Sequence, residues 1–112
     1  MKFSYDPSID DLFMYNPNSK SKGSIEIGDI ILDFNTKKEL VGMQILNASK
    51  FVEDLVDKNK VKDFFLTLKE CSFEVKSQKN WLLIKLKLIS KSLEIMPTIT
   101  LPKITNSSQA IK

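Results

Sequence analysis

The sequence predicts an α+β domain, namely a mostly antiparallel sheet of about seven or eight short strands with a central helical segment packed on it. Apolar and polar residues alternate along residues 2–48 and again along residues 71–102, as they do in half-buried strands. Between these ends, apolar residues recur at the spacing of a helix. The chain has 112 residues, of which 42% are hydrophobic. We therefore expect one domain with one core over residues 1–104, followed by a flexible polar tail over residues 105–112.

Residues 2–48 are expected to form a β-meander. The alternating stretches are residues 2–6, 12–15, 25–27, 29–35 and 40–46. Turn-forming residues separate them, above all Asp6-Pro7-Ser8 and the polar run from Asn16 to Gly23. The last stretch is apolar on both faces, so it should be a central strand. Gly42 inside it indicates a bulge or a close backbone approach.

Residues 49–70 are expected to form one broken helix or two short helices. Ser49 stands where a helix N-cap is expected, because its hydroxyl can accept a hydrogen bond from a free backbone N–H. Two groups of large apolar side chains follow, separated by a polar run near Asn59. They are Phe51, Val52, Leu55 and Val56, and then Val61, Phe64, Phe65 and Leu68. Their burial should dock the segment onto the sheet.

Residues 71–102 return to the strand period and predict a hairpin. Setting Lys76 opposite Trp81 pairs Val75 with Leu82, so that inward apolar side chains face one another across the hairpin. Beyond it, Leu93, Ile95, Ile99 and Leu101 alternate with polar residues. Pro97 and Pro102 cannot donate to a strand ladder, so this stretch should be an edge strand or be broken in two.

The composition argues against catalysis. All 17 basic residues are lysine and there is no histidine, so the chain lacks the usual general base and the commonest metal ligand. Cys71 is the single cysteine, and its place in an alternating strand is typical of a small buried hydrophobe rather than a nucleophile. We expect no cofactor and no enzymatic activity. A lone cysteine fits a reducing compartment.

No targeting segment is visible at the N-terminus, and the longest apolar run, Trp81-Leu82-Leu83-Ile84, is far too short to cross a bilayer. We therefore expect a cytoplasmic protein with no membrane partner. Its charge is uneven, because residues 1–59 hold seven lysines and ten acidic residues, whereas residues 60–112 hold ten lysines and four acidic residues. Such polarity could steer an anionic partner or favour self-association, although a solvated surface looks the same.

Two motifs in the N-terminal half carry a family resemblance. The first is Tyr5-Asp6-Pro7 with Asp10 and Leu12-Phe13-Met14, and the second is Asp33-Phe34 with the run from Leu40 to Asn47-Ala48-Ser49. Over residues 2–50 the chain resembles a small prokaryotic domain family of unknown function, number 2283 in that series, and an α/β extension follows. The resemblance implies a small antiparallel β domain and no activity, and some members look like partners of small toxin-like proteins. Gln44 and Lys38 depart from the family's usual acidic residue and turn glycine.

Two acidic groups are candidate sites. Asp6, Asp10 and Asp11 could offer oxygens to a hard cation, but their spacing does not match a calcium loop, and turn formation or strand capping explains Asp6 and Asp10 equally. Asp29, Asp33 and Asn35, with Glu26, could do acid–base chemistry if crowding raised the pKa of one carboxyl. An exposed strand face has the same composition.

The hairpin offers the most specific interaction surface. Lysines around an aromatic side chain could track phosphates and stack a base. The residues concerned are Lys76, Lys79, Trp81, Leu83, Lys85 and Lys87. Trp81, Leu83 and Ile89 also make the outer face partly apolar, which favours a homodimer.

From these features we expect a non-catalytic protein-interaction or regulatory module. It would act as a homo-oligomer or with a small protein partner. Binding of single-stranded nucleic acid through the lysine-rich hairpin is the alternative, and an enzyme is the least expected function.

Overall fold

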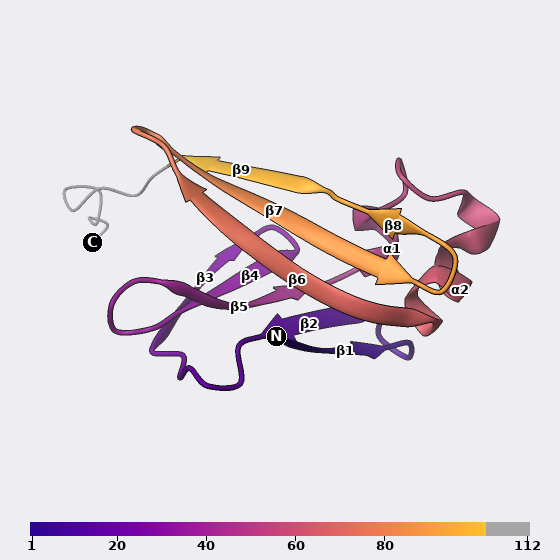
Figure 1. Cartoon of the computed structure of the whole chain (residues 1–112), viewed down its shortest axis with the longest axis horizontal. Coiled ribbons are helices and arrows are strands. Elements are labelled where there is room, and N and C mark those ends of the chain that lie inside the picture. The colour runs from indigo at the N-terminus through magenta and orange to yellow at the C-terminus, as the bar shows by residue number, and fades with distance from the viewer. Residues whose placement is uncertain (103–112) are drawn as a thin grey trace.

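Two antiparallel sheets lie one above the other in a computed structural model, which describes residues 1–102 (Figure 1). The N-terminal sheet contains β1 (Lys2–Asp6), β2 (Asp11–Tyr15), β3 (Gly23–Ile27), β4 (Ile30–Phe34) and β5 (Leu40–Ile45). The C-terminal sheet contains β6 (Leu68–Ser77), β7 (Trp81–Ser90), β8 (Glu94–Ile95) and β9 (Thr98–Pro102). The α+β fold class with mostly antiparallel strands is confirmed. The expected tail, residues 105–112, lies outside the described residues.

The N-terminal sheet has the strand order β1-β2-β5-β4-β3, which departs from a simple meander. β5 returns to pair with β2, so that it becomes the central strand, as its two apolar faces predict. Gly42 meets the predicted close approach, because a Cβ there would lie 3.1 Å from the Asp33 carboxylate. A register shift between Asp33 and Phe34 occurs at the same place.

The hairpin of β6 and β7 forms as predicted, but the register is wrong by two residues. Val75 pairs with Ile84 rather than with Leu82, and Ser77 pairs with Leu82. The backbone N–H of Gln78 donates to the carbonyl of Trp81 at 2.8 Å, which leaves a tight turn over Lys79 and Asn80. A shift by two keeps every side chain on its face, so alternation alone does not distinguish the two registers.

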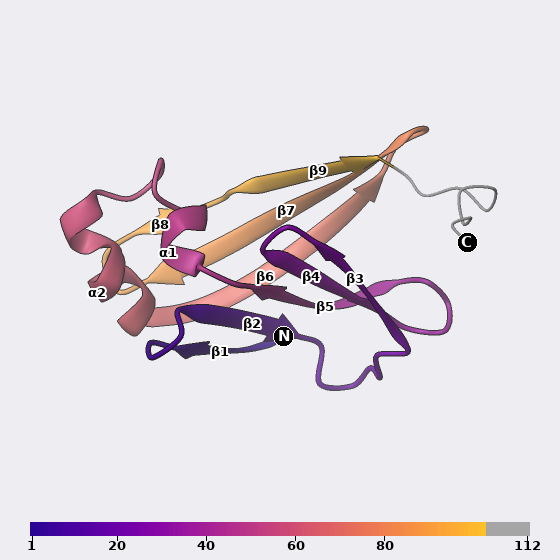
Figure 2. The same ribbon diagram turned by 180° about the vertical axis from the view of Figure 1, so that it is seen from behind.

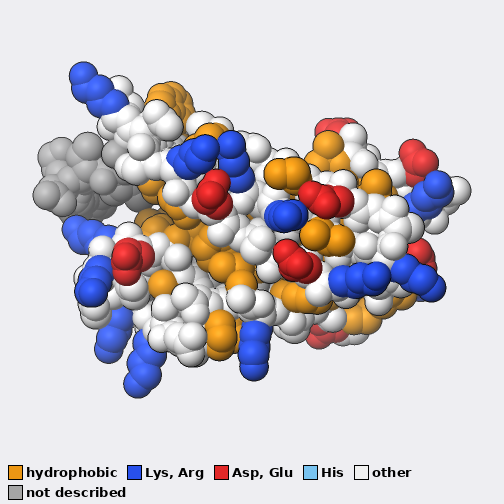
Figure 3. Space-filling view, in the orientation of Figure 1, with side chains coloured by type: hydrophobic (Ala, Val, Ile, Leu, Met, Phe, Trp, Pro, Cys, Tyr) orange, Lys and Arg blue, Asp and Glu red, His pale blue; other side chains and the backbone are white. Residues whose placement is uncertain are grey.

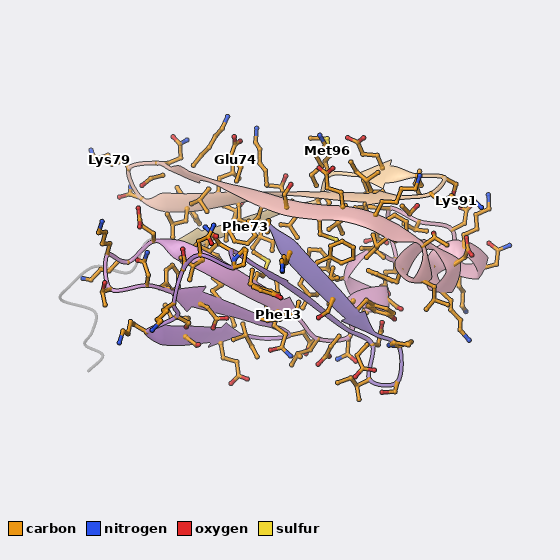
Figure 4. The ribbon with its side chains drawn as sticks, turned by 60° about the horizontal axis from the view of Figure 1, so that its bottom comes forward. Phe13, Phe73, Glu74, Lys79, Lys91 and Met96 are labelled. Carbon is orange, nitrogen blue, oxygen red and sulfur yellow. The ribbon has the colours of Figure 1, made fainter. Side chains whose placement is uncertain are left out.

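The last stretch is broken in two, as expected. β8 and β9 both pair with β7, and the N–H of Leu86 donates to the carbonyl of Pro97 between them at 2.9 Å. β7 is therefore hydrogen-bonded on both sides, to β6 on one and to β8 and β9 on the other. Figure 4 shows the alternation on β6, where Phe73 points toward the N-terminal sheet and Glu74 points away.

The helical segment is shorter than expected. It consists of α1 (Ala48–Phe51), a 3₁₀ turn η1 (Lys58–Lys60) and α2 (Val61–Leu66). β6 begins at Leu68, so the end of the predicted segment belongs to a strand. The helices lie together at one end of the two sheets (Figure 2). Within residues 1–102, no helix has the length and apolar character needed to cross a membrane.

One core joins both sheets and the helices. Its fully enclosed side chains include Leu12, Met14, Leu32, Met43 and Ile45 from the N-terminal sheet and Cys71, Ile84, Leu86 and Leu88 from the C-terminal sheet. Phe64 and Phe65 of α2 close it at the helical end, where Tyr5 stacks on Phe65 with ring centroids 4.8 Å apart.

Candidate functional site

The carboxylate of Asp10 holds two distant parts of the chain together. Its oxygens accept hydrogen bonds from the Tyr5 hydroxyl at 2.6 Å and from the Ser49 hydroxyl at 3.0 Å. The backbone N–H of Ser49 also donates to this carboxylate, at 3.1 Å, and the N–H of Ala48 donates to the Asp10 carbonyl at 2.9 Å. We call these four residues the Asp10 clasp. It ties the turn between β1 and β2 to the start of α1.

The Asp10 clasp corrects the predicted helix cap. Asn47 is the N-cap, with φ at 53°, and its side chain makes no capping bond. The carboxylate that satisfies the Ser49 N–H comes instead from Asp10, 39 residues earlier. Asp10 itself has φ at 57°, a left-handed conformation that aspartate and asparagine tolerate better than most residues. Backbone conformation and hydrogen bonding therefore together fix the positions of Asp10 and Asn47.

The Tyr5 phenol should make stability depend on pH. Burial, together with the hydrogen bond to Asp10 and its negative charge, raises the pKa of this phenol from 10.0 to about 12. The folded state favours the neutral phenol, so this contribution is complete below pH 10.0 and is lost as the pH rises through about 12. In urea unfolding between pH 9 and 12, we expect the unfolding free energy of Tyr5→Phe to fall less steeply than that of the wild type.

The buried Cys71 thiol, whose pKa burial also raises to about 12, is present in both proteins and cancels in this comparison. Equal pH slopes for the two proteins would contradict the assignment. At neutral pH, where the Tyr5 phenol of the wild type is protonated in both the folded and the unfolded state, the variant should lose about 1 kcal/mol, the typical contribution of one hydrogen bond.

The three candidate aspartates for a metal do not share a site. Asp6 accepts hydrogen bonds from the Ser8 hydroxyl at 2.6 Å and the Ser8 N–H at 2.9 Å, which form a turn and lower the pKa of Asp6. Asp11 accepts a bond from the Gln44 amide at 3.1 Å. Asp10 is held in its clasp. No group of three histidine, cysteine, aspartate or glutamate side chains converges like metal ligands within the described residues.

The second acidic group is also engaged in local structure. Asp33 accepts a bond from the Ser24 hydroxyl across β3 and β4 at 2.5 Å, and Asp29 accepts one from the Asn47 amide at 3.3 Å. Asn35 closes the turn before β5, where its side-chain oxygen accepts the N–H of Lys37 at 2.9 Å. These hydrogen bonds show that Asp29, Asp33 and Asn35 stabilise the strands and turns in which they lie. Cys71 is 2% exposed, and burial raises the pKa of its thiol, so it packs as a hydrophobe.

The C-terminal sheet turns one face away from the N-terminal sheet. We call it the outer face, and it brings most of the predicted hairpin residues together. Strand pairing and alternation place there Glu70, Ser72, Glu74 and Lys76 of β6, Trp81, Leu83, Lys85, Lys87 and Ile89 of β7, and Glu94, Thr98 and Thr100 of the last two strands. Lys79 lies in the turn at the tip of the hairpin (Figure 4).

Charge is distributed unevenly along the outer face. Glu70 and Glu94 flank Ile89 at the helical end, while Lys76 lies beside Leu83 near the tip. Trp81 is half exposed, at 50%, and Met96 is 61% exposed. Glu70 and Glu94 thus lie at one end of the face and Lys76 near the other, with Glu74, Lys85 and Lys87 between them and apolar side chains along its length.

An apolar cleft between the two sheets was not predicted. It has a volume of about 490 Å³, and the β6 and β7 residues that line it lie in the half of the hairpin near its tip. Its apolar lining residues are Met1, Phe34, Leu40, Phe73, Val75, Leu82 and Ile84. Alternation identifies Val75 and Leu82 as inward-facing. The sequence does not indicate, however, that the tip of the hairpin extends past the N-terminal sheet and leaves these side chains partly uncovered.

Two curated archaeal proteins are similar to part of this chain. An uncharacterized protein of Methanocaldococcus jannaschii is 42% identical over 50 residues, which is 45% of this chain and 43% of that protein. A protein of Methanosarcina mazei, provisionally named a hypoxanthine phosphoribosyltransferase, is 38% identical over 48 residues, which is 43% of this chain and 39% of its own length. This chain thus spans less than half the length of these curated relatives.

No solved structure matches the chain significantly. Residues 2–49 match the sequence profile of a family described as "Protein of unknown function (DUF2283)". This segment runs from β1 to the residues of α1 that the Asp10 clasp holds. The resemblance predicted from the two sequence motifs is therefore confirmed: residues 2–49 are similar to the DUF2283 family of uncharacterised proteins.

Proposed function

We propose that the protein is a non-catalytic protein-interaction module that acts as a homodimer through the outer face of its C-terminal sheet. The observation that carries this proposal is that Glu70 lies near one end of that face and Lys76 near the other, with Leu83 and Ile89 beside them. If two copies pack face to face about a two-fold axis at the Phe73–Leu86 pair, Glu70 of each copy meets Lys76 of the other, while Lys85 of each copy lies opposite Lys87 and lowers the affinity by repulsion. Leu83 and Ile89 would then pack within the interface.

The dimensions of the face favour a weak dimer. β7 has ten residues and is about 34 Å long, and three strands are about 14 Å wide. The outer face thus offers about 500 Å² per copy, less than the ~800 Å² per partner of a standard interface. We therefore expect association that depends on protein concentration and weakens as salt screens the charges.

A non-catalytic role is supported by what the candidate reactive groups do. The sequence has no histidine, and its one thiol is buried with a raised pKa. Asp10, Asp11 and Asp33 each accept hydrogen bonds that serve the fold. A reducing compartment such as the cytoplasm would suit the single thiol.

The test is the oligomeric state of two matched variants. At high protein concentration, light scattering should give the wild type twice the chain mass of 12.8 kDa. Leu83→Glu, which places a charge inside the proposed interface, should remain a monomer. Ile31→Glu makes the same change at a partly buried position on the exposed side of the N-terminal sheet and should still dimerise. A monomeric wild type, or a dimer that both variants retain, would exclude the proposal.

Charge reversal tests the arrangement of the two copies. Glu70→Lys alone and Lys76→Glu alone should each weaken the dimer, and the two together should restore it, because residues 70 and 76 face each other across the axis.

The alternative function is binding of single-stranded nucleic acid. The outer face carries as many glutamates as lysines, which disfavours binding along a phosphate backbone. If the monomer instead binds a labelled single-stranded oligonucleotide and Trp81→Ala abolishes that binding, the nucleic-acid alternative replaces the homodimer.

A further inference from the structure

The apolar cleft leaves hydrophobic side chains of both sheets open to solvent at one end of the molecule. Val75 is 38% exposed although it faces the N-terminal sheet, and Phe34 and Leu40 lie across from it. Figure 3 shows hydrophobic side chains in a hollow on this face, with lysine side chains around it. A cleft of about 490 Å³ is large enough to receive several side chains of a partner.

The β6 edge of the C-terminal sheet borders this cleft, and within residues 1–102 no strand pairs with the backbone groups on that edge. The bond from the Gln78 N–H to the Trp81 carbonyl fixes which residues of β6 pair with β7. Antiparallel geometry then directs the N–H and C=O groups of Gln78, Lys76 and Glu74 toward β7. Those of Phe73, Val75 and Ser77 point to the opposite side, where no strand of residues 1–102 is hydrogen-bonded to β6, although β1 packs near β6 and Met1 lines the cleft.

The same three residues also line the cleft with their side chains. A strand added along this edge would therefore make backbone hydrogen bonds and place every second side chain over the cleft at the same time. The inward positions of such a strand should be apolar, because Phe34, Leu40 and Leu82 surround the space that they would enter.

The charges around the cleft favour acidic residues at the other positions. Lys38 lies at the cleft and Lys79 at the hairpin tip, while Lys76 and Glu74 flank Val75 on the outer face of β6. Glu39 is the acidic residue of the lining, and its carboxylate accepts a bond from the Asn35 amide at 2.9 Å. Excess positive charge at this opening attracts an acidic partner.

From this arrangement we propose that the β6 edge between Phe73 and Ser77 is a strand-addition site for an extended peptide segment of a partner protein, in which apolar residues alternate with acidic ones. The site uses the edge and inner side of the C-terminal sheet, so it is separate from the outer face assigned to the homodimer. It also identifies the class of small protein partner that the sequence leaves open.

The test is direct binding of a labelled ten-residue peptide of alternating valine and glutamate to the full chain, followed by fluorescence anisotropy. We expect a dissociation constant of about tens of micromolar at low salt, typical of a short strand-addition contact. A peptide of alternating valine and lysine should bind at least about tenfold more weakly. Equal binding of both peptides would overturn the proposed acidic selectivity.

The Val75→Pro variant distinguishes backbone hydrogen bonding by an added strand from side-chain contact in the cleft alone. Proline removes the N–H that faces the open edge but no N–H that pairs with β7, a position where an edge strand tolerates it. This variant should lose at least about tenfold in affinity, while Val75→Thr, which keeps the N–H, should stay within about threefold. Unchanged binding by the folded Val75→Pro protein would overturn strand addition.

Lys38→Glu provides an independent test that does not alter β6, since Lys38 lies in the turn before β5. This variant should weaken binding of the valine–glutamate peptide but not of the valine–lysine peptide, and the reverse result would contradict the assignment.

Two other occupants of the cleft are separate outcomes of these tests. If Val75→Pro abolishes dimerisation, a second copy occupies the edge; if palmitate displaces the labelled peptide and binds Val75→Pro equally well, the cleft is a lipid pocket. Either result overturns the peptide proposal.

Discussion

Replacing Asp10 by alanine is expected to lower the free energy of unfolding by about 3 kcal/mol, because several hydrogen bonds to one partly buried carboxylate are lost together. The Tyr5 hydroxyl and the N–H and hydroxyl of Ser49 all lose their acceptor. Alanine also tolerates the left-handed conformation at this position, with φ at 57°, less well than aspartate does. Both effects reduce the stability of the folded state.

Urea unfolding at neutral pH measures this loss, and Asp10→Asn is the matched control. Asparagine accepts the left-handed backbone and keeps one oxygen acceptor, so its cost should be about 1 kcal/mol. Hydrogen exchange at the Ser49 amide should accelerate more in Asp10→Ala than in Asp10→Asn. If alanine costs no more than asparagine, the Asp10 clasp does not contribute to stability as described.

Leu86→Ala should destabilise the protein by about 3 kcal/mol, since truncating an enclosed leucine leaves a cavity as well as losing buried surface. Leu86 is 0% exposed on the middle strand of the C-terminal sheet and lies opposite Phe73 in the pairing of β6 with β7. The same truncation of Leu66, which is 54% exposed at the end of α2, should change stability by less than about 0.5 kcal/mol.

Thermal unfolding of Leu86→Ala also tests whether the two sheets depend on one core. Buried residues of both sheets belong to one cluster, so circular dichroism and Trp81 fluorescence should report one transition, shifted to lower temperature in the variant. Two separate transitions, with the fluorescence change first, would mean that the sheets unfold independently. That result would contradict the single core.

Side-chain alternation predicts which residues share a face, but it does not predict neighbouring strands. Ile84, Leu86 and Leu88 are buried as their spacing predicts, and Lys85 and Lys87 share the opposite face. The same alternation does not reveal that β5 pairs with β2, because any apolar strand satisfies it equally. The two-residue error in the hairpin register has this origin, since both registers leave the faces unchanged.

The candidate site depends on contacts between distant residues, and these were the least predictable. Asp10 stood in the sequence as one of three nearby aspartates, but its partner Ser49 is 39 residues away. A usable signal was present, because Tyr5, Asp10 and Ser49 are among the residues that carry the family resemblance. Shared motif residues can mark one three-dimensional contact even where no activity is known. The apolar cleft left no comparable signal, since it depends on how far one sheet extends past the other.

The apolar face of the N-terminal sheet is shielded from water only because the C-terminal half of the chain covers it. If the chain ended after residue 49, the side chains of Leu12, Met14 and Met43 would meet water. Any protein that carries this segment must therefore supply its own covering segment. That covering segment can differ in sequence and fold, provided that the face it turns to the sheet is apolar. Grafting the segment into a host without such a shield should give an insoluble product, however well its turns are preserved.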